Sequence, residues 1–161
     1  HDLLIPSLSI VIPAYNEERR LPATLARLDA FFEGPGFSFL EILIVNDGSR
    51  DGTAALVEAY AATNPRYRLL NNPGNRGKGY SVRHGMLEAR GEWILCTDAD
   101  LSAPIEELDK LITAARKQLA AVAIGSRALD RSLIGVHQPF FREYMGRSFN
   151  LVMRLATGLP F

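Results

Sequence analysis

The chain has 161 residues, the length of about one domain. Hydrophobic residues make up 47% of it and charged residues 22%, which is typical of a folded globular domain and excludes a disordered chain. Eighteen basic and eighteen acidic side chains cancel, so the net charge gives no reason to expect a nucleic-acid partner.

The sequence contains neither a long apolar run nor a cysteine pair. No segment approaches the roughly 18 consecutive apolar residues of a membrane-spanning helix. Cys96 is the single cysteine, so an internal disulfide cannot form, which fits a reducing compartment.

Strand and helix patterns alternate from the start of the chain. Residues 8–12 are rich in β-branched side chains and end at a proline, which predicts a buried strand, and residues 40–45 predict a second one. Between them, apolar residues recur at helical spacing from 21 to 32, and the Gly-Pro-Gly triplet at 34–36 ends that predicted helix.

The same alternation continues through the rest of the sequence. Asp51 caps a predicted helix, and Ser102 caps another that begins at Pro104. The remaining predicted elements are a helix at 53–62, a weaker strand at 67–70, a helix at 78–90, strands at 93–97 and 122–124, and a helix at 140–156.

This order of elements predicts an α/β fold with a mostly parallel sheet and helices on both faces. Ligands of such sheets bind beyond the carboxyl ends of the strands. Polar clusters follow the predicted strands at 13–17, 46–51, 98–100 and 126–127, so we expect a binding site at this edge.

Asp98 and Asp100 directly follow an apolar strand. In an extended segment residues i and i+2 point the same way, which places two hard oxygen donors together for Mg²⁺ or Mn²⁺. A solvated loop or a helix cap is the alternative interpretation, because an Asp-x-Asp pair alone is weakly specific.

Two glycines bracket Lys78 at a predicted helix start, within the segment 75–79. A helix N-terminus with Lys78 and Arg76 suits a diphosphate, although a solvated turn has the same composition. The segment is not a P-loop, which needs a longer glycine spacing and Ser or Thr after the lysine.

A third polar cluster, residues 46–53, is ordinary turn chemistry taken alone. As a binding element, Asp47 would accept a hydrogen bond from a nucleobase N–H. Tyr15 would then stack on or flank the base, and Glu17 would contact it.

Four segments, 12–18, 46–53, 75–79 and 98–100, occur in the order typical of family 2 glycosyltransferases of the GT-A fold, which the chain resembles over nearly its whole length. Within that family it is most similar to dolichyl-phosphate β-glucosyltransferases and prokaryotic polyprenyl-phosphate glycosyltransferases. The segments 75–79 and 82–85 carry this finer match.

The resemblance implies a role for each matching residue. Lys78 reaches the diphosphate, Arg127 lies near the phosphates, and Asp98, Asp100 and Ser102 hold a Mg²⁺ or Mn²⁺ ion, with Asp100 the preferred direct ligand. The residues expected to bind the nucleotide sugar are Pro13, Ala14, Tyr15, Glu17, Val45, Asp47, Lys78, Asp98, Ala99 and Asp100.

The reaction implied is inverting transfer of a hexose, glucose from UDP-glucose rather than a GDP-sugar, to a polyprenyl or dolichyl phosphate. Such an acceptor is already largely dianionic and needs no general base. Transfer to a saccharide hydroxyl would need one. That reaction and a non-catalytic nucleotide-binding module are the alternatives.

The acceptor site is expected on the predicted helix at 140–156, where Arg142 and Arg147 would approach the lipid phosphate. Its apolar stripe fits a peripheral membrane contact or, alternatively, packing in the core. The resemblance further implies a single catalytic domain over residues 1–161 that lacks its C-terminal part. We expect it to act in the cytoplasm or at the cytoplasmic face of a membrane.

Overall fold

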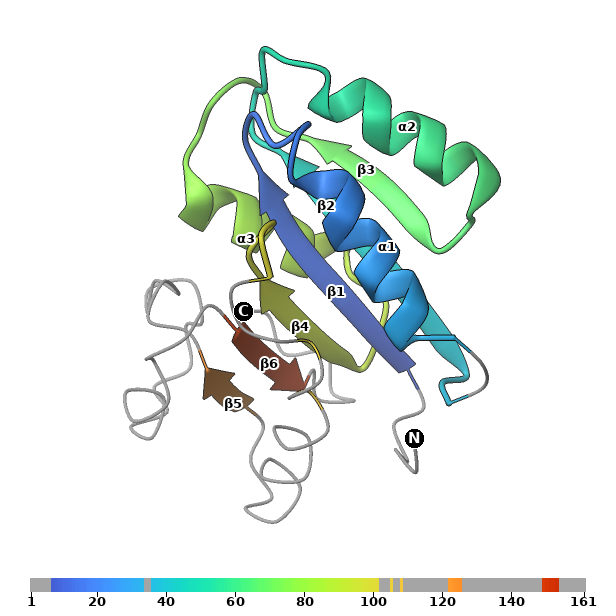
Figure 1. Ribbon diagram of the computed structural model, residues 1–161. Coiled ribbons are helices and arrows are strands. Elements are labelled where there is room, and N and C mark those ends of the chain that lie inside the picture. The colour runs from blue at the N-terminus through green and yellow to red at the C-terminus, as the bar shows by residue number, and fades with distance from the viewer. Residues whose placement is uncertain are drawn as a thin grey trace.

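The computed structural model describes residues 7–33, 36–101, 105, 108, 122–125 and 149–153, and for the last two ranges only the backbone. Strands and helices alternate along the first hundred residues (Figure 1). The elements are β1 Ser7–Ala14, α1 Leu21–Phe31, β2 Phe39–Asn46, α2 Thr53–Thr63, β3 Tyr67–Asn71, α3 Lys78–Glu88, β4 Trp93–Thr97, β5 Val122–Gly125 and β6 Phe149–Met153.

The six strands form one sheet in the order β3-β2-β1-β4-β6-β5. β3, β2, β1 and β4 are parallel, and β6 runs antiparallel to both β4 and β5. The register pairs Ala14 with Asn46 and Asn46 with Asn71. Because three neighbouring strands end level with one another, the loops that follow them start at the same edge.

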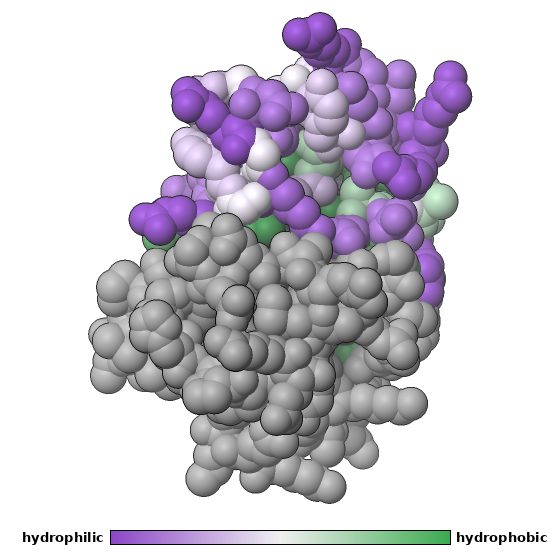
Figure 2. All heavy atoms as spheres, turned by 90° about the vertical axis from the view of Figure 1, so that its left-hand side faces the viewer, coloured by the Kyte–Doolittle hydropathy of each residue, from purple (hydrophilic) through white to green (hydrophobic). Residues whose placement is uncertain are grey.

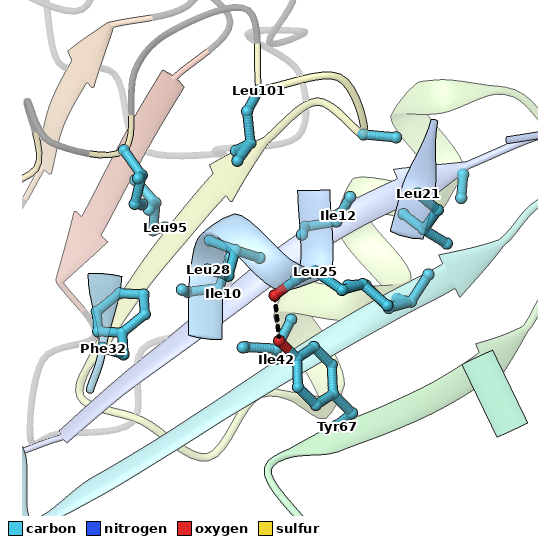
Figure 3. Close-up of a cluster of buried hydrophobic side chains, with 14 of the residues drawn as sticks. Ile10, Ile12, Leu21, Leu25, Leu28, Phe32, Ile42, Tyr67, Leu95 and Leu101 are labelled. Atoms are coloured by element: carbon cyan, nitrogen blue, oxygen red, sulfur yellow. Dashed lines mark hydrogen bonds between the residues drawn. The ribbon is translucent and has the colours of Figure 1, made fainter. Parts of the chain in front are cut away.

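One face of the sheet is covered by α1 (Figure 3). Leu21, Leu25 and Leu28 recur at i, i+4 and i+7, are fully buried, and pack with Ile10 and other side chains of the strands. Burial of one such leucine contributes about 1.5–3 kcal/mol. α2 joins the same layer, because Val57 is part of this core.

α3 covers the opposite face, where Gly85 lies against the sheet. A Cβ atom at Gly85 would come within 2.3 Å of Val11 Cγ1 and 3.2 Å of Val45 Cγ2. The glycine therefore lets α3 approach β1 and β2 closely, and helices cover both faces of the sheet.

A buried carboxylate anchors the turn between α3 and β4. Glu41, 3% exposed, accepts hydrogen bonds from Ser9 Oγ at 2.6 Å and from the Arg90 backbone N–H at 2.6 Å. Arg68 forms an ion pair with it at 3.1 Å, so the charge is neutralised where it is desolvated. The far end of α3 is thereby tied to the first two strands.

The structure confirms the predicted α/β fold with a mostly parallel sheet and helices on both faces. Element bounds differ from the predictions by one or two residues. Asp51 accepts the Thr53 N–H at 3.0 Å, although the N-cap residue of α2 is Gly52. The predicted helix from Pro104 and its cap Ser102 lie largely outside the described residues, which include only Ile105 and Leu108 of that segment.

The predicted helix at 140–156 is wrong over Phe149–Met153, which forms strand β6. Phe149 and Val152 fit a helical stripe, but short apolar runs are compatible with both periodicities. The edge of β4 decides between them: β6 pairs with Trp93–Thr97 over its whole length and supplies partners for the backbone N–H and C=O groups there. An interfacial helix cannot include these five residues.

Candidate functional site

A pocket of about 260 Å³ lies at the edge of the sheet where the parallel strands end. The loops after β1, β2 and β4 and the first turn of α3 enclose it. Its lining residues are Pro13, Ala14, Tyr15, Glu17, Asp47, Lys78, Ser81, Asp98, Ala99 and Asp100.

The loops after β1 and β2 hold each other by reciprocal hydrogen bonds. Asn16 N–H donates to Ser49 Oγ at 2.9 Å, and Asn16 Oδ1 accepts the Arg50 N–H at 2.9 Å. Asn16 has a φ of +53°, a conformation that asparagine tolerates better than most residues. Tyr15 is 44% exposed beside it, so a flat aromatic side chain stands at the rim of the pocket.

Asp47 holds the segment that leads into α3. Its carboxylate accepts the backbone N–H groups of Arg76 at 2.7 Å and Gly77 at 2.9 Å. Gly77 has a φ of +96°, which favours glycine. Gly48 lies so close to this segment that a Cβ atom there would approach Asn75 N to 2.6 Å. The β2 loop and the start of α3 therefore form one packed unit.

The two carboxylates after β4 lie on a turn rather than on an extended segment. Leu101 N–H donates to Asp98 O at 3.0 Å, and Leu101 has a φ of +48°. Thr24 of α1 donates its hydroxyl to Ala99 O, which fixes the turn from the other side. Asp98 and Asp100 line the same pocket, but through this turn and not through the extended geometry that the sequence predicted.

Acidic groups outnumber basic ones in the lining, where four carboxylates meet Lys78. Lys78 Nζ forms an ion pair with Asp98 Oδ1. Arg20 forms an ion pair with Glu17 at 2.6 Å and lies 3.9 Å from Asp100 Oδ2. The side chains of Asp98 and Asp100 are 27% and 41% exposed, so both carboxylates are open to solvent in the pocket.

The pair Asp98–Asp100 fits a hard divalent cation. Mg²⁺ typically takes one or two carboxylates and completes its shell with phosphate oxygens and water. In the part of the chain that the structure describes, no three His, Cys, Asp or Glu side chains gather as a metal site.

Cys96 lies on β4 just before these carboxylates and is 3% exposed. Burial raises the pKa of its thiol to about 12, and the charge of Lys78 opposes part of that rise. The thiol is therefore protonated at neutral pH and acts as a core side chain, not as a nucleophile.

Most of the predicted nucleotide-sugar residues meet in this pocket. Val45 does not line it, because it is fully buried beneath α3. Ser102, Arg127, Arg142 and Arg147 lie outside the described residues.

Sequence reasoning missed Ser81, Thr24 and Arg20. Ser81 shares the lining, while Thr24 and Arg20 support it from α1 and the residue before it. Residue type and spacing give no signal for them, since each lies among ordinary helix residues.

An α/β sheet with a carboxylate pair and a lysine at a helix start gathered at its strand ends is typical of the α/β class of domains that bind ligands at this edge. The comparison with protein families identifies it further. Residues 9–158 match the model of glycosyl transferase family 2, so the chain belongs to that family.

Curated relatives act on polyprenyl phosphates, as their names state. The chain is 38% identical to a dolichyl-phosphate beta-glucosyltransferase of Trichomonas vaginalis, over 92% of this chain and 46% of the relative. It is 40% identical to a dolichyl-phosphate beta-glucosyltransferase of Drosophila melanogaster, over 92% and 49%. It is also 33% identical to an undecaprenyl-phosphate 4-deoxy-4-formamido-L-arabinose transferase of Shewanella sediminis, over 99% and 46%.

Solved structures share the GT-A fold. A mannosyltransferase from Pyrobaculum calidifontis in complex with GDP-Man and Mn²⁺ superposes with a TM-score of 0.69 at 20% identity, over 95% of this chain and 47% of that one. S. aureus TarS in complex with UDP-GlcNAc superposes with a TM-score of 0.57 at 26% identity, over 72% and 33%. At 20% identity, the similarity to the mannosyltransferase concerns the fold alone.

The chain spans about half the length of the curated relatives that it matches. The described helices include none that is both long and apolar enough to cross a bilayer. Figure 2 shows the side of the molecule that lies on the left in Figure 1, where α3 is labelled. The described part of this surface is mainly hydrophilic.

Proposed function

We propose that the chain forms the nucleotide-sugar-binding part of an enzyme that transfers glucose from UDP-glucose to a polyprenyl phosphate with inversion at the sugar. The observation that carries this proposal is the meeting of Lys78, Asp98 and Asp100 in one pocket beside the exposed ring of Tyr15. Family membership supports the reaction class, and the relatives' names support glucose and a lipid phosphate.

The charge of the pocket supports a metal-dependent mode of binding. A diphosphate would enter a lining with four carboxylates and one lysine, which repels it without a further cation. Asp98 and Asp100 would hold Mg²⁺ or Mn²⁺, which when bound neutralises charge on the departing diphosphate. Lys78, at the N-terminus of α3, adds a second positive charge on the phosphate side.

The other lining residues suit the nucleoside. Tyr15 offers an aromatic face at the rim, and Pro13 and Ala14 end β1 at the pocket floor. Asp47 and Glu17 would contact the base and ribose, although both carboxylates already accept hydrogen bonds within the chain.

The carboxylates of the described lining have other proposed or observed roles: Asp98 and Asp100 are proposed to hold the metal, and Asp47 accepts backbone N–H groups. No histidine belongs to the described lining, and Glu17 is ion-paired with Arg20. A phosphate monoester needs no deprotonation, whereas a saccharide hydroxyl does. This difference favours a lipid phosphate over polysaccharide synthesis.

Calorimetry with UDP and GDP, each with and without Mn²⁺, tests the proposal on this chain. UDP should bind in Mn²⁺ at least about tenfold more tightly than GDP and should lose most of its affinity without the metal. Asp100→Ala should abolish the metal-dependent part while circular dichroism and thermal unfolding stay close to wild type. Equal UDP affinity of the variant and wild type in saturating Mn²⁺ would show that the metal assignment is wrong.

The acceptor side is tested in a longer protein that includes this chain. Arg142 and Arg147 are proposed to bind the lipid phosphate, because two guanidinium groups match phosphate oxygens. Arg147→Ala should lose transfer to polyprenyl phosphate but keep UDP binding, and Arg147→Lys should restore only part of the transfer. Unchanged transfer by Arg147→Ala would place the acceptor site elsewhere.

A further inference from the structure

A small buried polar network joins two residues of the pocket lining, Asp47 and Ser81, to Asn72 and His84, which lie behind the lining. Its centre is Asn72, directly after β3 and 7% exposed. The side-chain amide donates to Asp47 Oδ1 at 2.9 Å and to Ser81 Oγ at 2.8 Å. Asn72 Oδ1 lies 2.8 Å from His84 Nδ1. All the hydrogen-bonding groups of this amide are therefore used.

These contacts leave one orientation for the amide. Both N–H groups of Asn72 are donated, so its oxygen accepts, and the His84 Nδ1 carries the proton of that hydrogen bond. The flipped amide would turn its oxygen toward the Asp47 carboxylate and leave His84 Nδ1 facing an N–H group. The Asp47 carboxylate thus fixes the direction in which Asn72 donates, and His84, half-buried on α3, holds the amide oxygen.

The network holds the backbone just before Lys78 through two anchors. Asp47 accepts the N–H groups of Arg76 and Gly77. Ser81 receives the Asn72 amide and donates to Gly77 O at 3.0 Å. Asn72 is the one described side chain that is hydrogen-bonded to both of these anchors.

We propose that Asn72, whose side-chain oxygen is held by His84, is a positioning residue that sets where Lys78 and the start of α3 meet the diphosphate. The inference rests on the proposed function and concerns the phosphate half of the site. Asn72 does not line the pocket, so it acts through Asp47 and Ser81 and not by contact with the ligand. Removing its amide leaves Asp47 Oδ1, Ser81 Oγ and His84 Nδ1 each short of a partner, and the segment before α3 loses its fixed course.

The test compares a nucleoside diphosphate with its monophosphate in the same Mn²⁺ concentration, because only the diphosphate carries the second phosphate that Lys78 is proposed to contact. The Kd values of UDP and UMP are measured in Mn²⁺ by calorimetry for wild type, Asn72→Ala, Lys78→Ala and the double variant. Asn72→Ala should weaken UDP binding by about tenfold and UMP binding by less than about twofold. The double variant should bind UDP no more weakly than Lys78→Ala, because both changes remove the same interaction.

Asn71→Ala is the matched control, since Asn71 is the neighbouring exposed asparagine and its side chain accepts from Asn46 Nδ2 at 2.9 Å. It should leave the ratio of the UMP and UDP Kd values at its wild-type level. If Asn72→Ala does not fold, His84→Ala carries the same test with a smaller expected loss of about two- to fivefold for UDP.

Three results would overturn the inference. The first is that Asn72→Ala weakens the binding of UDP and of UMP equally. The second is that the losses of UDP affinity are additive in the double variant. The third is that the ratio of the UMP and UDP Kd values is unchanged in both Asn72→Ala and His84→Ala. If any of these results is obtained but the wild-type protein binds UDP in Mn²⁺, the inference is wrong and the proposed function is retained. If the wild-type protein binds neither UDP nor GDP, both the proposed function and this inference are wrong.

Discussion

Lys78 forms an ion pair with Asp98 across the pocket, although one begins α3 and the other follows β4. Each is a residue that the proposed function uses for binding, the lysine for the diphosphate and the carboxylate for the metal. The ammonium group of Lys78 thus lies at the side of Asp98 where a metal cation is proposed to bind. Binding of metal and diphosphate would release both partners at once, each to a new ion.

Lys78→Met keeps the length of the side chain and removes its charge, and its effects on two ligands should have opposite signs. UDP in Mn²⁺ should bind about tenfold or more weakly, because a charge on the phosphates is lost. Mn²⁺ alone should bind more tightly, by up to about fivefold, because Asp98 no longer has a competing cation and the pair is partly exposed. Titration of Mn²⁺ by electron paramagnetic resonance measures the second effect, and weaker Mn²⁺ binding by the variant would contradict it.

Gly85→Ala should destabilise the fold by about 1–3 kcal/mol, because the new methyl group meets Val11 Cγ1 and forces α3 away from the sheet. Val11→Ala provides the matched suppressor, since it empties the space that the methyl group needs. In urea denaturation the double variant should therefore lose less free energy of unfolding than the sum of the two single losses. Additive losses would show that α3 does not pack on β1 at this point.

The positions of β1 and β2 could be predicted from composition, because these strands are buried on both faces and contain the apolar runs 10–12 and 42–45. Lys78 was predicted at a helix start because glycines stand on either side of it. β6 was missed because its conformation depends on β4, about fifty residues earlier in the chain. Local periodicity carries no information about a free strand edge.

The candidate site shows the same division between local and distant causes. Asp98, Asp100 and Asp47 were predicted because acidic residues at strand ends are visible in the sequence. Asn72 and His84 were not, because their importance lies in one amide that joins β3, the β2 loop and α3. Contacts of this kind between distant segments cannot be predicted from residue type or spacing.

Alkaline pH should loosen the contact between α1 and α2. The hydrogen bond from Tyr60 to Asp29, with burial and the Asp29 charge, raises the pKa of Tyr60 to about 12. Since the pKa is raised above its unfolded value of about 10, this stabilisation is complete below pH 10 and is lost as the pH rises toward 12. Tyr60→Phe should therefore show a smaller fall in the free energy of unfolding across that range.

The measurement is urea denaturation at a series of pH values for both proteins. Tyr67 remains in both, and burial, followed by its hydrogen bond to Asp29, raises the pKa of that phenol as well. The variant should thus keep part of the pH dependence. Identical slopes for wild type and Tyr60→Phe would refute the assignment.

Cys96 should resist thiol reagents until the chain unfolds. Its burial and its raised pKa leave a thiolate population near pH 8 that is roughly a thousandfold below that of a free cysteine. Reaction with a disulfide reagent should be slow in buffer and immediate in concentrated guanidinium chloride. Rapid labelling of the native chain would mean that β4 is not buried as described.

The insertion of β6 between β4 and β5 has a consequence for synthesis on the ribosome. Residues 7–97 emerge first and supply β3, β2, β1 and β4, but the outer edge of β4 stays without a partner until Phe149–Met153 has been made. An open edge next to apolar side chains is prone to pair with other chains. Folding of this sheet is thus completed late and by a distant segment, which predicts slow closure and a need for protection of the nascent chain.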